Sequence, residues 1–266
     1  MSLRAQPVLD RLVRLGYLAK GLIYTLIGVL ALRVGIGMRG GSLTDPAGVL
    51  MTLLRKPFGA LLLTLIAVGI ISYSLYYIVE AIADLRHKGG GVKGWGGRSL
   101  TIIKAVAYGS IGVQALLLVV RNRGTSKDTE DTARTVMLYP LGDVVLALIG
   151  AGIVVYAIAQ LRTAWRGDVD DDMDVSRVRR EAAWLVPVGR FGTVARSVIL
   201  ALMGGTLTFA ALHEHPTDVN TFSEALATIA SLNPWLLAMI GAGLFCFGLY
   251  EGCRARYVKL APTQTP

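Results

Sequence analysis

Apolar residues occur along this chain in blocks of about 20, separated by short charged stretches. A helix of about 20 apolar residues spans the hydrocarbon core of a bilayer, so the pattern is that of an all-α multi-pass membrane protein. It excludes a single soluble core. We predict six transmembrane helices, at residues 12–34, 58–82, 100–120, 141–161, 192–212 and 235–253.

One motif recurs in the first, third and fifth predicted helices. Two basic residues stand six apart, a tyrosine follows four residues after the second, and a glycine follows eight after it. The copies are Arg14, Lys20, Tyr24 and Gly28; Arg98, Lys104, Tyr108 and Gly112; and Arg190, Arg196, Leu200 and Gly204, where leucine replaces the tyrosine. These helices are therefore one element used three times.

The second, fourth and sixth helices also correspond to one another. Each carries a glycine with an aromatic residue four positions later: Gly69 and Tyr73, Gly152 and Tyr156, and Gly243 and Phe247. Amphipathic segments at 45–59, 129–142 and 220–235 join the helices of each pair, and we expect them to lie as short helices at the outer membrane surface.

The unit is thus helix, surface helix, helix, and it occurs at residues 11–84, 95–166 and 187–257. Each unit crosses the membrane twice, so the three copies have the same orientation and form parallel repeats. We expect them to assemble as a pseudo-threefold bundle. Residues 167–186 are expected to form a charged cytoplasmic loop.

The distribution of charge changes the interpretation of the formal net charge of +9. With the predicted spans, the side that holds both termini carries 19 basic and 10 acidic residues, and the other side carries 8 of each. The excess follows the positive-inside rule, which puts both termini in the cytoplasm. Such a surface attracts anionic lipid headgroups, and it does not indicate a nucleic-acid partner.

The basic triplet of Lys20, Lys104 and Arg196 has two interpretations. Lys20 lies eight residues into the first span, about 12 Å along a helix, which is within reach of the interface for a snorkelling side chain. Alternatively, the three residues bind a ligand: they converge near the bundle axis and form a cationic pocket for an anion, a lipid phosphate or a carboxylate, or they lie on the outer rim and each bind a separate headgroup. The first interpretation is the simpler one.

Other side chains in the helices are candidates for the same site. Glu80 is expected to pair with a basic residue of a neighbouring helix, and the alternative is a proton relay or a substrate site. Tyr24 and Tyr108 are candidates for ligand contact, although packing and hydrogen bonds between helices explain most of the tyrosines. The stripe of Gly21, Gly28 and Gly35 indicates close helix packing without a wide aqueous pore.

Several segments together resemble a known bacterial membrane family. They are RLGYLAKGLIY (14–24), Pro57-Phe58-Gly59, Gly-Leu-Tyr250 and Ala255-Arg256-Tyr257, and they are similar to the family known as domain of unknown function 1206. The resemblance covers essentially the whole chain as three tandem two-span domains. It implies an integral protein of a bacterial membrane, which we expect to be the inner membrane, and it carries no established activity.

Composition and missing motifs narrow the function. The chain is 53% hydrophobic and has a mean hydropathy of +0.55, and it holds no P-loop, dinucleotide-binding fingerprint, HExxH or Cys-x-x-Cys motif. We therefore expect no enzyme, cofactor or metal site. The favoured function is non-catalytic binding of a lipid, a hydrophobic ligand or a membrane protein partner. The alternative is a small anion or solute transporter or channel that uses an axial basic cluster.

Overall fold

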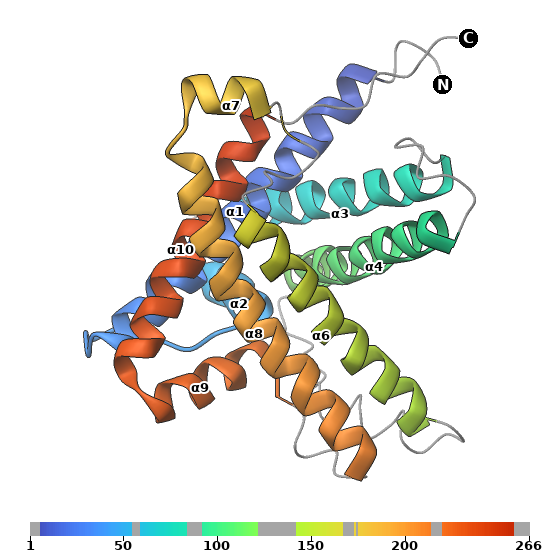
Figure 1. Ribbon diagram of the computed structural model, residues 1–266. Coiled ribbons are helices and arrows are strands. Elements are labelled where there is room, and N and C mark those ends of the chain that lie inside the picture. The colour runs from blue at the N-terminus through green and yellow to red at the C-terminus, as the bar shows by residue number, and fades with distance from the viewer. Residues whose placement is uncertain are drawn as a thin grey trace.

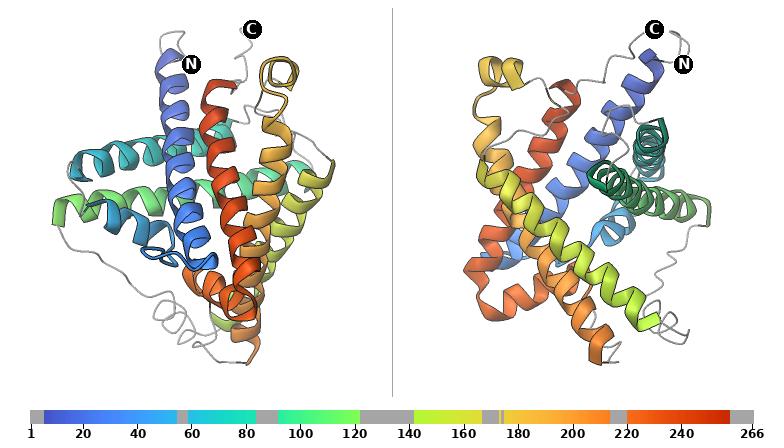
Figure 2. Two further views of the ribbon diagram at one scale, coloured as in Figure 1. Left: turned by 90° about the vertical axis from the view of Figure 1, so that its left-hand side faces the viewer. Right: turned by 45° about the vertical axis from the view of Figure 1, so that its right-hand side comes forward.

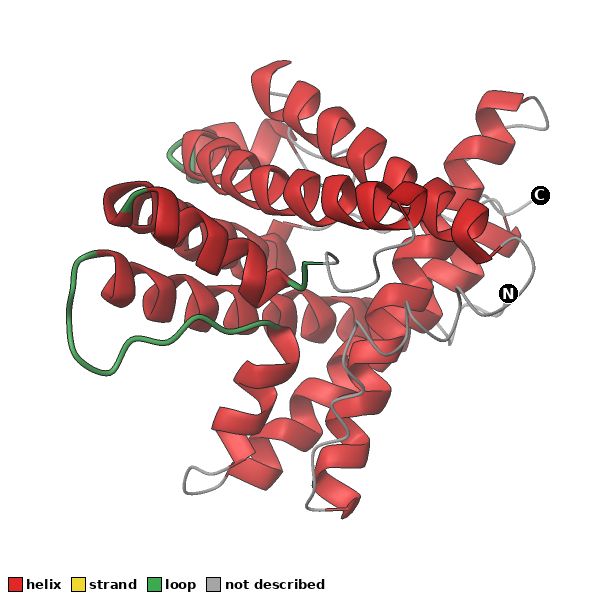
Figure 3. Cartoon of the chain, turned by 90° about the horizontal axis from the view of Figure 1, so that it is seen from below, coloured by secondary structure: helices red, strands yellow, loops and turns green. Residues whose placement is uncertain are grey.

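Helices make up nearly all of the part of the chain that the computed structural model describes, which is residues 6–54, 59–83, 92–121, 142–166, 173, 175–213 and 220–257 (Figures 1 and 3). The described helices are α1 (Gln6–Gly35), α2 (Pro46–Leu54), α3 (Gly59–Ala83), α4 (Val92–Arg121), α6 (Gly142–Arg166), α7 (Val175–Glu181), α8 (Leu185–His213), α9 (Phe222–Leu232) and α10 (Pro234–Tyr257). All six predicted spans fall on long helices, which extend up to eight residues beyond the predicted ends.

Five of the long helices, α1, α3, α6, α8 and α10, are apolar and long enough to cross a membrane. In α4 the described apolar stretch is shorter, Tyr108–Val120. Large apolar side chains point outward from all six helices, among them Leu65, Val113 and Leu148. An exterior of this kind suits a lipid environment and not water.

The long helices pack as three pairs, and each pair joins two different repeats. The second helix of one repeat lies against the first helix of the next, which gives the pairs α3 with α4, α6 with α8, and α10 with α1. This cyclic relation is the pseudo-threefold arrangement expected from the repeats. The pairs do not run side by side as in a simple bundle. They cross one another in different directions, and α3 and α4 pass behind α1 and α10 (Figure 1; Figure 2, left).

The predicted glycine stripe of α1 forms the contact with α10. Gly21 lies against Gly252, Gly28 against Phe245 and Gly35 against Ala238, so the helices are antiparallel and in register over two heptads. A Cβ atom on any of these three glycines would lie under 3.0 Å from backbone atoms of α10. The prediction of close packing is confirmed here. The start of α1 and the end of α10 consequently lie at the same end of the molecule (Figure 2).

The glycine that closes each copy of the motif occupies the same place in all three pairs. Where Gly28 meets Phe245, Gly112 meets Ile71 of α3, and Gly204 meets the carbonyl of Gly150 and the side chain of Ile153 in α6. In a membrane, small residues permit the close backbone approach that holds helices together. The repeated glycine is therefore the crossing point of each pair.

Packing inside the repeats is less regular, because the second repeat differs from the other two. In the first and third repeats the two long helices also touch, with Gly16 against Tyr73 and Gly192 against Phe247. The equivalent position in the second repeat is Leu100, a residue too large for such an approach. Among the described residues α4 and α6 are not a principal packing pair, and Gly152 has no neighbouring atom within 4 Å of an added Cβ.

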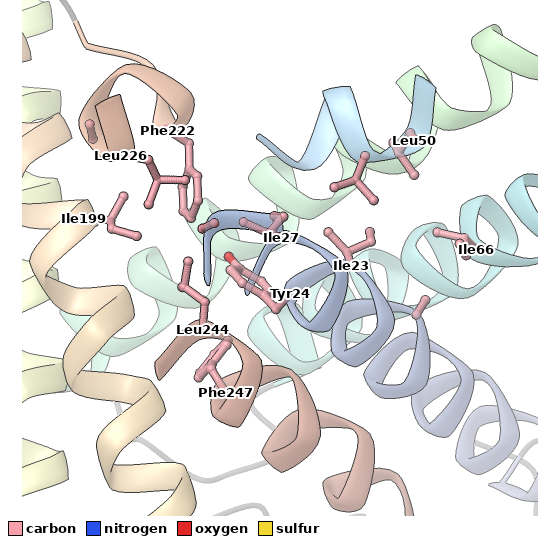
Figure 4. Close-up of a cluster of buried hydrophobic side chains, with 14 of the residues drawn as sticks. Ile23, Tyr24, Ile27, Leu50, Ile66, Ile199, Phe222, Leu226, Leu244 and Phe247 are labelled. Carbon is pink, nitrogen blue, oxygen red and sulfur yellow. The ribbon is translucent and has the colours of Figure 1, made fainter. Parts of the chain in front are cut away.

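The helices α2 and α9 confirm two of the three short helices predicted between the spans; residues 129–141 lie outside the described part. Asp45 begins α2 by accepting a hydrogen bond from the amide of Gly48, and Thr221 and Glu224 form a capping box at the start of α9. One face of each is buried, with Leu50 and Leu226 fully enclosed, and reaches the core around α1 (Figure 4).

The charged segment 167–186 also holds regular structure. The short helix α7 lies in it, and Val178 packs with Leu185 and Tyr257 in a small apolar cluster. Arg177 pairs with Glu181 one turn later, at 2.9 Å between Nε and Oε1. The segment is therefore not a loop throughout.

The pairing of α6 and α8 predicts opposite effects for two adjacent glycines. Gly204→Ala should lower the free energy of unfolding by about 1–3 kcal/mol, because its Cβ would meet the Gly150 carbonyl. Gly205→Ala should be neutral or stabilising, since no atom of the described residues lies within 4 Å of its Cβ. Reversible unfolding in mixed micelles measures both. Equal effects of the two substitutions would contradict the pairing.

Candidate functional site

Buried charges and aromatic rings gather where the three helix pairs cross. Lys20 of α1 is 7% exposed, and its Nζ lies 2.8 Å from Oε1 of Glu251 in α10. The side chain therefore points into the protein, and the expectation that it snorkels to the interface is wrong. In a membrane interior, a paired and buried lysine of this kind marks a structural or functional centre.

A chain of hydrogen bonds extends from this ion pair across α1 to α3. Arg254 lies one turn after Glu251 and donates to the same carboxylate oxygen at 3.3 Å. Its other terminal nitrogen donates to the hydroxyl of Tyr17 at 3.2 Å. The Tyr17 hydroxyl is 3.2 Å from that of Tyr77, and Tyr73 donates to Tyr77 at 3.3 Å. The network thus links the first and third repeats.

Aromatic rings surround the ammonium group of Lys20. Its Nζ lies 5.2 Å from the ring centres of Tyr108 and Phe247, and 5.9 Å from that of Tyr73. These rings come from three helices, α4, α10 and α3. Attraction between a cation and the faces of aromatic rings strengthens when water is excluded.

Arg196 of α8 occupies the neighbouring position in the cluster and is 8% exposed. Its Nε donates to the hydroxyl of Tyr24 at 3.1 Å, and its Cζ lies 5.2 Å from the ring centre of Phe247. The rings of Tyr24 and Phe247 meet edge to face, 4.9 Å apart, beside the apolar core (Figure 4). Phe247 therefore contacts both buried cations.

The two cations differ in how their charge is balanced. Lys20 has a carboxylate partner, whereas no carboxylate of the described residues lies within 4.0 Å of Arg196. The repeats explain the difference. Glu251 lies eight residues after Gly243, and the residues eight after the equivalent glycines, Gly69 and Gly152, are Tyr77 and Gln160. Of the three equivalent positions, only the one facing Lys20 carries an acid.

The remaining predicted site residues are placed as follows. Tyr24 and Tyr108 belong to the cluster, and Glu80 is buried near the end of α3 with 3% exposure. Lys104 lies on α4, and its side chain is outside the described residues. Lys20 pairs with Glu251, which was not among the predicted site residues.

Glu251 and Arg254 were not among the residues predicted for the site, although both belong to its centre. A signal for them was present in the repeat alignment. Since the second helix of one repeat packs antiparallel to the first helix of the next, the position eight after Gly243 faces the position of Lys20. An acidic residue at that position can form an ion pair with the lysine that it faces.

The geometry favours holding an anion over acid–base chemistry. The described central carboxylate, Glu251, is engaged by two cations. A guanidinium keeps its charge in proteins, and a buried cation is costly without an anion beside it. Arg196 therefore leaves positive charge at the centre of the molecule that the described residues do not balance.

Comparisons with known proteins agree with this repeated architecture. The family model described as Domain of Unknown Function (DUF1206) matches three segments, residues 15–84, 101–167 and 191–258. The chain belongs to the DUF1206 family. A relative from Bacillus subtilis (strain 168), "Uncharacterized protein YxxB", is 32% identical over 256 residues, which is 95% of this chain and 92% of that protein. No solved structure matches the chain.

The three DUF1206 segments correspond to the three predicted repeats and confirm the resemblance seen in the sequence. Each segment holds one pair of long helices, so this member of the family is a multi-pass membrane protein built from a triplicated two-helix unit. The second helix of each DUF1206 segment packs against the first helix of the next, so the three units are in close contact with one another. The site lies where all three meet.

The buried ion pair predicts a non-additive response to mutation. Lys20→Met should cost about 2–4 kcal/mol of unfolding free energy, because it leaves the buried Glu251 carboxylate with Arg254 as its remaining cationic partner among the described residues. The double variant Lys20→Met/Glu251→Gln should recover part of that loss, since the carboxylate that has lost its lysine is gone.

The exposed pair of Arg177 and Glu181 is the control for this cycle, with both side chains more than 40% exposed. Arg177→Met should change the unfolding free energy by less than about 1 kcal/mol. Unfolding in mixed micelles measures all the variants. Purely additive effects of Lys20→Met and Glu251→Gln would show that the two side chains do not interact.

Proposed function

We propose that this DUF1206 protein is a non-catalytic protein of the bacterial inner membrane that binds an anionic membrane ligand at its central cation cluster. In this proposal all six long helices span the bilayer, α4 included, and both termini are cytoplasmic. The observation that carries the proposal is Arg196, a buried guanidinium without a carboxylate partner among the described residues. An anion supplied by a ligand would balance its charge.

The proposed orientation rests on charge and on helix pairing. The antiparallel contact of α1 with α10 brings the start of one and the end of the other to the same side. That side holds the excess of basic residues predicted to face the cytoplasm. The cations of the cluster then lie nearer to the cytoplasmic leaflet, in which anionic lipids attract basic groups.

The core favours binding over transport. Toward α2 and α9, the cluster borders a layer of buried apolar side chains that includes Ile23, Ile27, Leu50, Leu226 and Leu244 (Figure 4). A charged solute would have to cross this layer to reach the other side, at the cost of leaving both water and the cations. A bound anion at the cluster needs no such passage.

Native mass spectrometry and a flux assay separate binding from transport. Protein released from nanodiscs of equal parts phosphatidylglycerol and phosphatidylcholine should retain the anionic lipid in preference to the neutral one. Liposomes of the same composition that contain the protein should show no chloride or phosphate flux above empty liposomes. Absence of retained anionic lipid, together with flux abolished by Lys20→Ala, would overturn the proposal in favour of an anion transporter.

A further inference from the structure

We infer that an acidic phospholipid of the surrounding bilayer enters between α4 and α6, on the open side of the second repeat, and binds Arg196 through its phosphate. This inference rests on the proposed function and adds the residue, the ligand class and the route. It follows from three observations: the unused donors of Arg196, the missing packing in the second repeat, and the aromatic rings that join Arg196 to α4.

The guanidinium of Arg196 is held in place with donors to spare. Its Nε is fixed by the hydroxyl of Tyr24, and its plane lies near the rings of Tyr24 and Phe247. Its terminal nitrogens, Nη1 and Nη2, make no hydrogen bond to the described part of the chain. A guanidinium positioned in this way can donate two parallel hydrogen bonds to a phosphate, with its orientation already set.

The open side of the second repeat is defined by Gly152 and by the separation of α4 from α6. The first and third repeats close at the equivalent place through Gly69 and Gly243, which have atoms of the facing helix within 4 Å of an added Cβ. Gly152 has none and is exposed. Among the described residues, one of the three equivalent contacts is therefore not made, and a lipid chain is the material that fills such a space in a bilayer.

Arg196 lies beside the aromatic rings that border this open side. The ring of Phe247 lies 5.2 Å from both Arg196 and Lys20, and Lys20 in turn lies 5.2 Å from the ring centre of Tyr108 in α4. Because α8, which carries Arg196, also packs against α6, the guanidinium lies near both helices of the second repeat. Apolar residues exposed on each of them, Val113 on α4 and Val155 on α6, suit an acyl chain.

The depth of Arg196 is within reach of a lipid headgroup. Arg190 lies one and a half turns earlier in α8 and donates to the carbonyls of Ala164 and Trp165 at the end of α6. Six residues of helix correspond to about 9 Å, so a phosphate would move about that distance inward along α8 to meet Arg196.

Two matched pairs of variants test the inference by native mass spectrometry from the same mixed nanodiscs. Arg196→Gln should lower the retention of phosphatidylglycerol by about tenfold or more, whereas Arg190→Gln, which removes a charge from the same helix, should change it by less than about twofold. Arg196→Lys should restore part of the binding. Gly152→Trp should block the open side, and Gly205→Trp, at an equally uncrowded position of α8, should not.

The outcomes separate the inference from the proposed function. If wild-type protein retains no anionic lipid, the proposed function fails. If it retains the lipid and neither Arg196→Gln nor Gly152→Trp reduces retention relative to its control, the site or the route is wrong and the inference is overturned. Binding of inorganic phosphate alone, dependent on Arg196 and unaffected by Gly152→Trp, would overturn the choice of a lipid. Gly152→Trp leaves the buried cluster untouched, so its result does not depend on the folding of Arg196→Gln.

Discussion

The structure depends on the close approach of antiparallel helices at glycines. Lipid tails are as apolar as the helix surfaces, so burial of apolar area does not drive the helices together, and contact between backbones has to do so. Gly28, Gly112 and Gly204 provide that contact at the same place in three pairs. Since each pair joins two repeats, the same contact that fixes two helices also fixes the order of the repeats around the centre.

The enclosed charges follow from this arrangement. The basic residue that precedes each repeated glycine by eight positions is carried toward the centre with it, and the described members of the set, Lys20 and Arg196, are both buried. Divergence between the repeats then decides the electrostatics. Glu251 balances Lys20, while Gln160 stands at the equivalent position in the helix that pairs with the helix of Arg196. The equivalent positions of the three repeats therefore differ in charge at the centre of the molecule.

Much of the fold could be predicted from the sequence, because its signals are local. The length of the apolar blocks predicted the six long helices, and the recurring motif predicted the repeats. The spacing of Gly21, Gly28 and Gly35 predicted which face of α1 packs closely. The position of a packing face does not show which helix packs against it. The pairing of α1 with α10, the crossing of the pairs and the role of Glu251 were therefore not predicted. Depth alone also could not tell whether Lys20 points to lipid or inward, since both are within reach of its long side chain.

The central claim is that helices pair between successive repeats and enclose the cations. An experimental density map of the protein in lipid nanodiscs, at a resolution that shows side chains, tests it most directly. We predict that α1 packs against α10 with Gly28 at the crossing, and that the ammonium group of Lys20 lies about 2.8 Å from Oε1 of Glu251. A map in which the two helices of each repeat pair with one another, and Lys20 extends to the lipid headgroups, would contradict it.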